Sequence, residues 1–158
     1  MEKEFFHNGL HGKGAHVDTA TVFDGLEWRT AGEKPGDCPH SIWELLNHMI
    51  YWQDFMLAYI KGETPKSPEH ATESWPESGA PANNEEWDAA VSRFLAGLQD
   101  AKQEAAKDLM EKGAEGKGRT RAEWLMGITL HNTYHAGQAV MVRRMSGTWP
   151  PPSGGDTW

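Results

Sequence analysis

Three histidines have the spacing and surroundings of metal ligands. His131 and His135 stand four positions apart in an apolar stretch that runs from Arg121 to Met145. Residues four apart on a helix lie on one face, a turn from each other, so both imidazoles can reach a single ion. Two ligands rarely hold a metal alone, and His48, in a second apolar stretch, is the candidate third ligand. The pattern predicts a three-histidine metal site.

Burying histidines among apolar side chains has a cost that a metal ion removes. A buried neutral imidazole needs partners for both of its ring nitrogens. A divalent ion supplies a partner to each of three rings, and three protein ligands leave a coordination position for water or substrate. That arrangement is typical of catalytic rather than structural zinc. Imidazole ligands suit zinc, nickel, iron and copper, and we expect zinc or nickel.

Two capped helices would carry these ligands. Ser41 and Glu44 form a capping box, in which each side chain accepts the other's backbone N–H, ahead of an apolar pattern that runs to Ile60. Thr120 and Glu123 form the same motif before the stretch that holds the histidine pair. Steps of three and four residues along that stretch place both of its histidines toward the core.

Two further helices complete a bundle. Apolar residues at helical intervals predict a helix over residues 15–26, which could start further upstream. A stronger stripe begins at Asn84 and continues to Leu109. The glycine-rich residues 113–118 end that helix. Four amphipathic helices without an alternating strand pattern predict an all-α fold. We expect a four-helix bundle, whose facing helices commonly house metal sites.

Segments rich in proline and glycine connect or follow these helices. Residues 29–39 are expected to form a loop, and the tail from Gly147 should lie extended over the surface as far as Trp158. Residues 63–84 show no periodicity, and loops this long are usually functional covers or crossover connections. We therefore expect a link that crosses the bundle between its second and third helices, with Trp75 pinning it.

The overall composition narrows the possible partners. The chain has 158 residues, expected as one domain over residues 1–158, and a formal charge of −8. Such a charge repels phosphate backbones and anionic membranes, so neither nucleic acid nor a membrane is expected as a partner. The chain also has a single cysteine, Cys38, no secretory signal in its first residues, and no apolar run of roughly 20 residues. These features favour a soluble protein of the reducing cytoplasm.

Other ionisable residues have simpler interpretations than metal binding. His7 and His11 repeat the four-residue spacing, but nearby glycines weaken a helix there by about 1 kcal/mol each relative to alanine. That pair is therefore expected to be solvated. His40, two helical turns before His48, could share the face of His48, but it lies at a capped helix end and is expected to meet solvent. Glu44 could be a fourth ligand or a general base one turn from His48, or simply an exposed capping residue.

Polar residues close to the candidate ligands could orient the imidazoles through hydrogen bonds, or could simply face solvent. They are Asn47, Asn132, Tyr134 and Gln138. Arg143 and Arg144 stand in the last turn of the predicted fourth helix, where they are expected to complement the helix dipole.

Three motifs resemble those of a known family. They are SIWELLNH at residues 41–48, HNTYHAGQ at residues 131–138 and GTWPPP at residues 147–152. Together they resemble the DinB family of metalloenzymes over nearly the whole chain. The resemblance implies a four-helix bundle with a long second link, and a divalent metal held by His48, His131 and His135. It also implies frequent homodimers, and some relatives are S-transferases that use bacillithiol, mycothiol or glutathione.

Three functions fit this pattern. In the first, the ion binds a low-molecular-weight thiol and presents its thiolate to a small electrophile. In the second, a bound water hydrolyses a small ester or amide. In the third, the bundle binds a metal or a small ligand without catalysis, and the same three histidines are structural.

Overall fold

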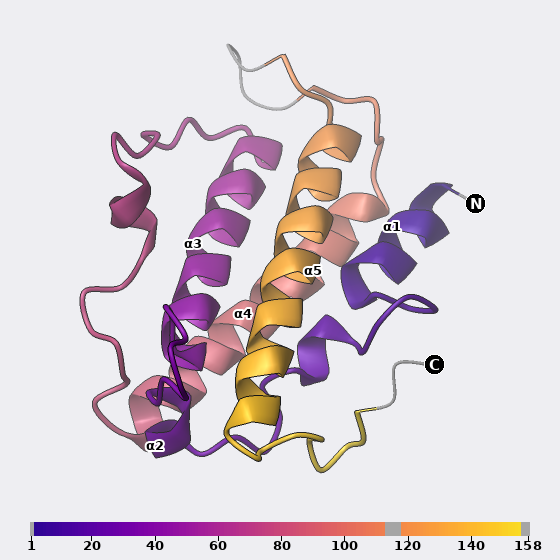
Figure 1. Cartoon of the computed structure of the whole chain (residues 1–158). Coiled ribbons are helices and arrows are strands. Elements are labelled where there is room, and N and C mark those ends of the chain that lie inside the picture. The colour runs from indigo at the N-terminus through magenta and orange to yellow at the C-terminus, as the bar shows by residue number, and fades with distance from the viewer. Residues whose placement is uncertain (1, 113–117, 156–158) are drawn as a thin grey trace.

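The computed structural model describes residues 2–112 and 118–155, which form an all-α fold without β-strands. Within these ranges the longer helices are α1 (Glu2–His11), α3 (Ile42–Ile60), α4 (Asn84–Ala105) and α5 (Arg121–Met145), shown in Figure 1. The connections contain a single turn of helix, α2 (Trp28–Ala31), and the 3-10 turns η1 (Thr19–Thr21) and η2 (Ala71–Ser74). No helix in the described part of the chain combines the length and apolar character needed to cross a membrane.

Both predicted capping boxes are confirmed. The Ser41 hydroxyl accepts the backbone N–H of Glu44, and the Glu44 carboxylate accepts the backbone N–H of Ser41 at 2.7 Å. Thr120 and Glu123 make the same reciprocal pair ahead of α5. These bonds satisfy N–H groups that a helix start leaves free, so both ligand-bearing helices begin where the sequence predicts.

The first helix lies upstream of the predicted one, so the predicted helix over residues 15–26 is wrong. Those residues form turns and η1, although Val22 and Phe23 are buried as their apolar character requires. Gly12 and Gly14 take positive φ angles of 66° and 82°, which end α1 and turn the chain back. Burial alone does not make a helix. The short turn α2 is a second difference, because it overlaps the start of the loop predicted for residues 29–39.

The link between α3 and α4 crosses the bundle, as predicted. Figure 1 shows it leaving the upper end of α3 and returning beside that helix to the lower end, where α4 begins. Helices α3 and α4 therefore run in the same general direction, with η2 of the link in contact with α3. Residues 147–155 continue past α5 without a helix, as expected, whereas Trp158 and residues 113–117 lie outside the described residues.

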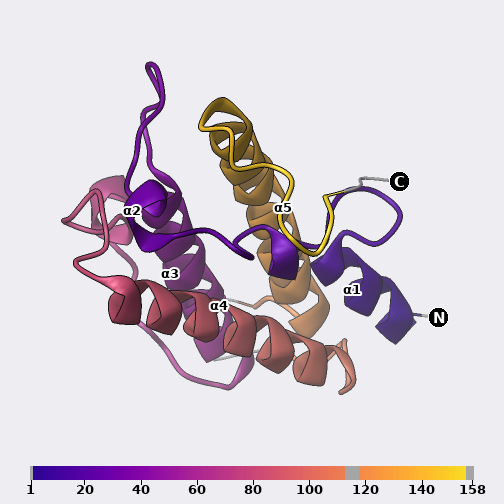
Figure 2. The same ribbon diagram turned by 90° about the horizontal axis from the view of Figure 1, so that it is seen from below.

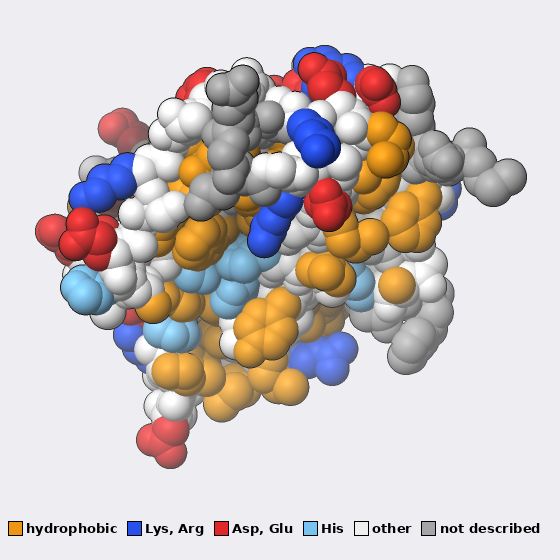
Figure 3. Space-filling model, turned by 90° about the horizontal axis from the view of Figure 1, so that it is seen from above, with side chains coloured by type: hydrophobic (Ala, Val, Ile, Leu, Met, Phe, Trp, Pro, Cys, Tyr) orange, Lys and Arg blue, Asp and Glu red, His pale blue; other side chains and the backbone are white. Residues whose placement is uncertain are grey.

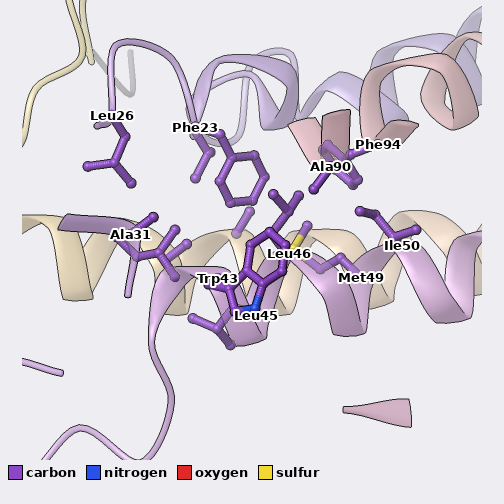
Figure 4. Packing of buried hydrophobic residues seen from close by; sticks show 14 of the residues in the cluster. Phe23, Leu26, Ala31, Trp43, Leu45, Leu46, Met49, Ile50, Ala90 and Phe94 are labelled. Carbon is purple, nitrogen blue, oxygen red and sulfur yellow. The ribbon is translucent and has the colours of Figure 1, made fainter. Parts of the chain in front are cut away.

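Two buried apolar clusters fill the interior, one at each end of the bundle. One joins the first half of α3 and of α4 to the end of α5, and the connection before α3 packs onto it through Phe23 and Leu26 (Figure 4). The other joins α1 to the ends of α3 and α4 and the start of α5, and Figure 2 shows α1 beside the other helices at that end. Along α5, residues 131–135 fall between the two clusters. A polar layer is thus possible at that level.

A buried amide bridge ties three helices together in this layer. The Gln53 side chain of α3 donates to the Phe94 carbonyl of α4 at 3.0 Å and accepts from the Asn132 amide of α5 at 3.0 Å. Gly97 makes room for it, because a Cβ there would lie 2.1 Å from the Gln53 amide nitrogen. The bridge fixes the spacing of α3 and α5, which carry the candidate ligands.

Candidate metal centre

The structure brings the three predicted histidines together. His48 from α3 and His131 and His135 from α5 have potential ligand atoms that all lie within 4.8 Å of one another. The Nε2 atoms of His48 and His131 are 3.3 Å apart, and the His131 and His135 ring centroids are 4.5 Å apart. We refer to these three residues as the histidine triad. His48 lies 83 residues before His131 in the sequence, so the packing of α3 against α5 creates the site.

Two hydrogen bonds determine which ring nitrogens of His48 and His135 are free to bind a metal ion. The Nδ1 of His48 lies 3.2 Å from the Ser74 carbonyl, and the Nδ1 of His135 lies 2.6 Å from the Gln138 side-chain oxygen. Both oxygens only accept, so each Nδ1 carries the proton and donates. In the neutral ring, Nε2 then presents its lone pair. Outer partners of this kind set the tautomer and orientation of histidine ligands.

An aromatic stack holds His48 in place. The Trp75 indole of the link lies between the imidazoles of His40 and His48, with centroid distances of 3.8 and 3.9 Å and interplanar angles of 12° and 11°. Trp75 therefore holds the link against the helices, as predicted, and it does so by stacking on His48, a member of the triad. The link also supplies the Ser74 carbonyl. Sequence reasoning missed that acceptor, because a backbone carbonyl in a proline-rich segment has no residue-type signal.

Burial keeps the triad neutral at physiological pH. Desolvation lowers the pKa of His48 from its ordinary 6.5 to about 4, and the neighbouring His135 adds to the effect. Desolvation also lowers the pKa of His131 to about 3, with His135 and His48 contributing. The pKa of His135 is lowered too, chiefly by burial. Unprotonated imidazoles are the form that ligates metals.

These shifts predict that metal-free protein loses stability in acid. The folded-state pKa values of His48 and His131, about 4 and about 3, lie below the ordinary 6.5. The unfolded chain therefore binds more protons as the pH drops below 6.5, and the free energy of unfolding should fall by on the order of 1 kcal/mol per pH unit. Urea unfolding of chelator-treated protein between about pH 7 and pH 5 measures this slope. His131→Asn should flatten it, and an equal slope in that variant would contradict the assignment.

The other residues proposed near the ligands divide into two groups. Gln138 orients His135, as one of the alternatives predicted, and the exposed Tyr134 ring packs edge-on against His135 with centroids 5.0 Å apart. Asn47 instead donates to the Trp43 carbonyl of its own helix, whereas Asn132 donates into the amide bridge and its side chain also acts to raise the pKa of His131 against the effect of burial. Only some of these side chains therefore support the triad.

Glu44 and His40 do not join the triad. Glu44 is engaged by the Ser41 N–H and by Lys34, whose Nζ lies 2.8 Å from its carboxylate, and this lysine contributes to lowering the pKa of Glu44 against the effect of burial. The expectation that it caps α3 is met, and the ligand alternative is not. His40 is half-buried and packs on Trp75, so it meets solvent only in part.

Two further expectations are corrected. His7 and His11 lie on α1, which tolerates Gly9, and only His7 is exposed; His11 is held by Asp18 at 2.7 Å. Arg143 does not serve as an exposed partner of the helix dipole, because it is 1% exposed and donates to the distant carbonyls of Val22 and Asp24. Arg144 is exposed.

The face shown in Figure 3 presents a central group of histidine side chains with hydrophobic side chains on its borders, and further histidines lie apart from that group. Two members of the triad, His48 and His135, are each 7% exposed, and His131 is half-buried. Aromatic rings approach His131 as well, since the Trp52 centroid lies 6.3 Å away. An apolar rim around a small polar centre is typical of sites for small molecules.

Comparison with known proteins places the chain in a family. Neither the curated proteins nor the solved structures gave a match. The family model of the DinB superfamily matches residues 14–139, which is more than half of the chain and includes the whole triad. The chain therefore belongs to the DinB superfamily.

Proposed function

We propose that the protein is a metal-dependent enzyme that transfers a low-molecular-weight thiol to small electrophiles. The observation that carries the proposal is the triad itself, three neutral histidines converging from two helices with no carboxylate in the described group. The 3.3 Å between the Nε2 atoms of His48 and His131 suits two ligands of one ion. Nitrogens bound at about 2.1 Å in tetrahedral geometry are about 3.4 Å apart. We propose zinc or nickel as the ion.

The three histidines would hold the ion and leave one position open. A bound divalent ion would supply Lewis acidity, which lowers the pKa of a coordinated thiol or water. Ser74 and Gln138 keep the Nδ1 protons of two ligands turned away from the centre. In the transfer, the thiol sulfur forms a bond to the electrophilic carbon, the leaving group departs with its bonding pair, and the thiol proton passes to solvent.

An apolar cavity beside the triad supports a small hydrophobic substrate. It has a volume of about 160 Å³, and Gln138 and His40 line it together with Leu45 and Val142. Gln138 also holds His135, so this cavity shares a wall with the centre. We propose that it receives the apolar part of the electrophile. A reducing cytoplasm, expected from the single cysteine, would keep the thiol in its reduced form.

Hydrolysis is the second candidate. A metal-activated water could attack a small ester or amide at the same open position. The described group that could hold an ion contains histidines only, and Glu44 is engaged in the cap of α3. With no free carboxylate there to act as a general base, we rank hydrolysis below thiol transfer.

A paired assay separates the candidates. Metal-loaded protein would be tested with bacillithiol, mycothiol or glutathione plus a model electrophile, and separately with a panel of simple esters. Thiol conjugation that is abolished in His135→Ala would support the transferase, and ester cleavage without a thiol would support the hydrolase. If no substrate turns over while the metal stays bound, the three histidines serve binding alone and the enzymatic proposal is wrong.

Replacing Trp75 should weaken metal binding without removing a ligand. Trp75→Ala deletes the surface that stacks on His48, and outer partners of a histidine ligand are typically worth about 10–100-fold in metal affinity. Competition with a chelating dye would measure the loss. Trp75→Phe keeps a stacking ring and should retain most of the affinity. Equal affinities in wild type and Trp75→Ala would show that the stack does not position the ligand.

The protein is also proposed to form a homodimer, as the family resemblance implies. Leu130, Tyr134, Met141 and Met145 recur at intervals that place them on one face of α5, and each is more than half exposed. Met141→Glu should convert a dimer to a monomer in light scattering. Met110→Glu, at another exposed methionine, should not. A monomeric wild-type protein would contradict the proposal.

A further inference from the structure

A second group of histidines and lysines surrounds a cavity outside the metal centre. The cavity, about 320 Å³ in volume, lies where the end of α1 and the following turn approach α4. Its lining contains three histidines, two lysines, an asparagine and a single acid, Asp18. Much of this lining, including His7, His11 and Lys13, precedes residue 14, where the match to the family model begins. The cavity is therefore largely a feature of this chain's own N-terminal segment.

His11 has a ring nitrogen that lacks a partner. Its Nδ1 lies 2.7 and 2.8 Å from the two carboxylate oxygens of Asp18, so Nδ1 donates. Its Nε2 is shielded from solvent and has no hydrogen-bond partner within the described residues. The His7 ring lies 5.5 Å away between centroids. In the neutral ring Nε2 then accepts, so a ligand with an O–H group, such as a hydrogen phosphate, would offset the free-energy cost of leaving it unpaired.

The charges around the cavity favour an anion. Lys13 and Lys102 both line it, and neither forms an ion pair with any residue in the described ranges, although the chain carries a net charge of −8. The negative charge of Asp18 offsets the positive charge of only one of these two lysines. Its carboxylate is already occupied by His11 and by the backbone N–H of Ala20. The cavity is thus locally positive and rich in donors.

We propose that this cavity binds the phosphate group of a small molecule. Phosphate offers several acceptor oxygens and the negative charge that two lysines would neutralise. A divalent cation fits less well, because the same lysines repel it. His16 is also unable to serve as a further ligand, since its ring nitrogens contact the Val17 carbonyl at 2.7 Å and the Thr133 hydroxyl at 3.1 Å. The cavity volume leaves room for a small organic group beyond the phosphate.

Titration with inorganic phosphate tests the proposal. Backbone and imidazole NMR signals of the full-length, as-purified protein would be followed at constant ionic strength. Saturable shifts should concentrate on residues 7–18 and Lys102. Lys102→Gln should weaken phosphate binding at least 10-fold, and Lys102→Arg, which keeps the charge, should retain most of it. Lys66→Gln is the matched control, because Lys66 is exposed and pairs with Glu69 at 2.9 Å far along the chain.

Several outcomes would overturn the proposal. One is an unchanged phosphate affinity in Lys102→Gln. Another is a set of shifts confined to the histidine triad, which would place the phosphate at the metal centre. Equal binding of acetate would mean that the cavity does not select phosphate. Zinc binding at His7 and His11 in place of phosphate would assign the cavity to a cation.

Discussion

Replacing His131 with alanine should remove the metal from the protein. Wild-type protein is expected to carry about one divalent ion per chain, as a three-ligand site implies. The variant keeps only His48 and His135, and loss of a direct ligand should exceed the roughly 10–100-fold effect of losing an outer partner. Elemental analysis after dialysis against metal-free buffer would measure the content.

The control for this experiment is another histidine on a helix. His7 is exposed on α1 and lies outside the triad, so His7→Ala should keep the wild-type metal content. Circular dichroism would establish that both variants keep their helices. Full occupancy in His131→Ala would refute the assignment of the triad as the metal centre, and the proposed chemistry would lose its basis.

Replacing Arg143 with alanine should give the largest loss of stability. The guanidinium is almost fully buried and donates to the carbonyls of Val22 at 2.6 Å, Asp24 at 3.0 Å and Thr148 at 2.8 Å. It thereby joins the chain before α3 to the tail after α5. Alanine would leave these carbonyls without their donor and open a cavity, at a cost of about 3–5 kcal/mol in the free energy of unfolding.

Urea unfolding followed by circular dichroism would measure that cost. Arg144→Ala is the matched control, since the neighbouring arginine is exposed and should change stability by no more than about 0.5 kcal/mol. Arg143→Lys should recover only part of the loss, because an ammonium cannot reach three carbonyls with a planar fork. Similar stabilities for Arg143→Ala and Arg144→Ala would show that the buried network contributes little.

The positions of the three candidate ligands were predictable because the signals are local. The capping boxes at Ser41 and Thr120 fix where two helices begin, and the spacing of His131 and His135 places them on one face. Predicting His48 as the third ligand required one further assumption, that two amphipathic helices face each other. A proline-rich link too long for a tight turn predicted the crossover in the same way.

Other features depend on contacts between distant residues, which local patterns do not encode. Apolar spacing near Phe23 looked helical, yet glycines with positive φ turn the chain there, while α1 forms upstream around Phe6 and Leu10. Arg143 had the position of a dipole partner, but two of its acceptors, the carbonyls of Val22 and Asp24, lie more than a hundred residues away in the sequence. Tertiary packing decides such cases.

The stacking of Trp75 between His40 and His48 couples the mobility of a surface connection to the chemistry of the interior. A metal ion bound to His48 would favour the ring position on which the indole stacks, and by thermodynamic reciprocity the stacked indole would favour metal binding. The position of the link between α3 and α4 would then depend on metal occupancy. The environment of Trp75, on the connection between the two helices, would therefore differ between the metal-free and the metal-bound protein.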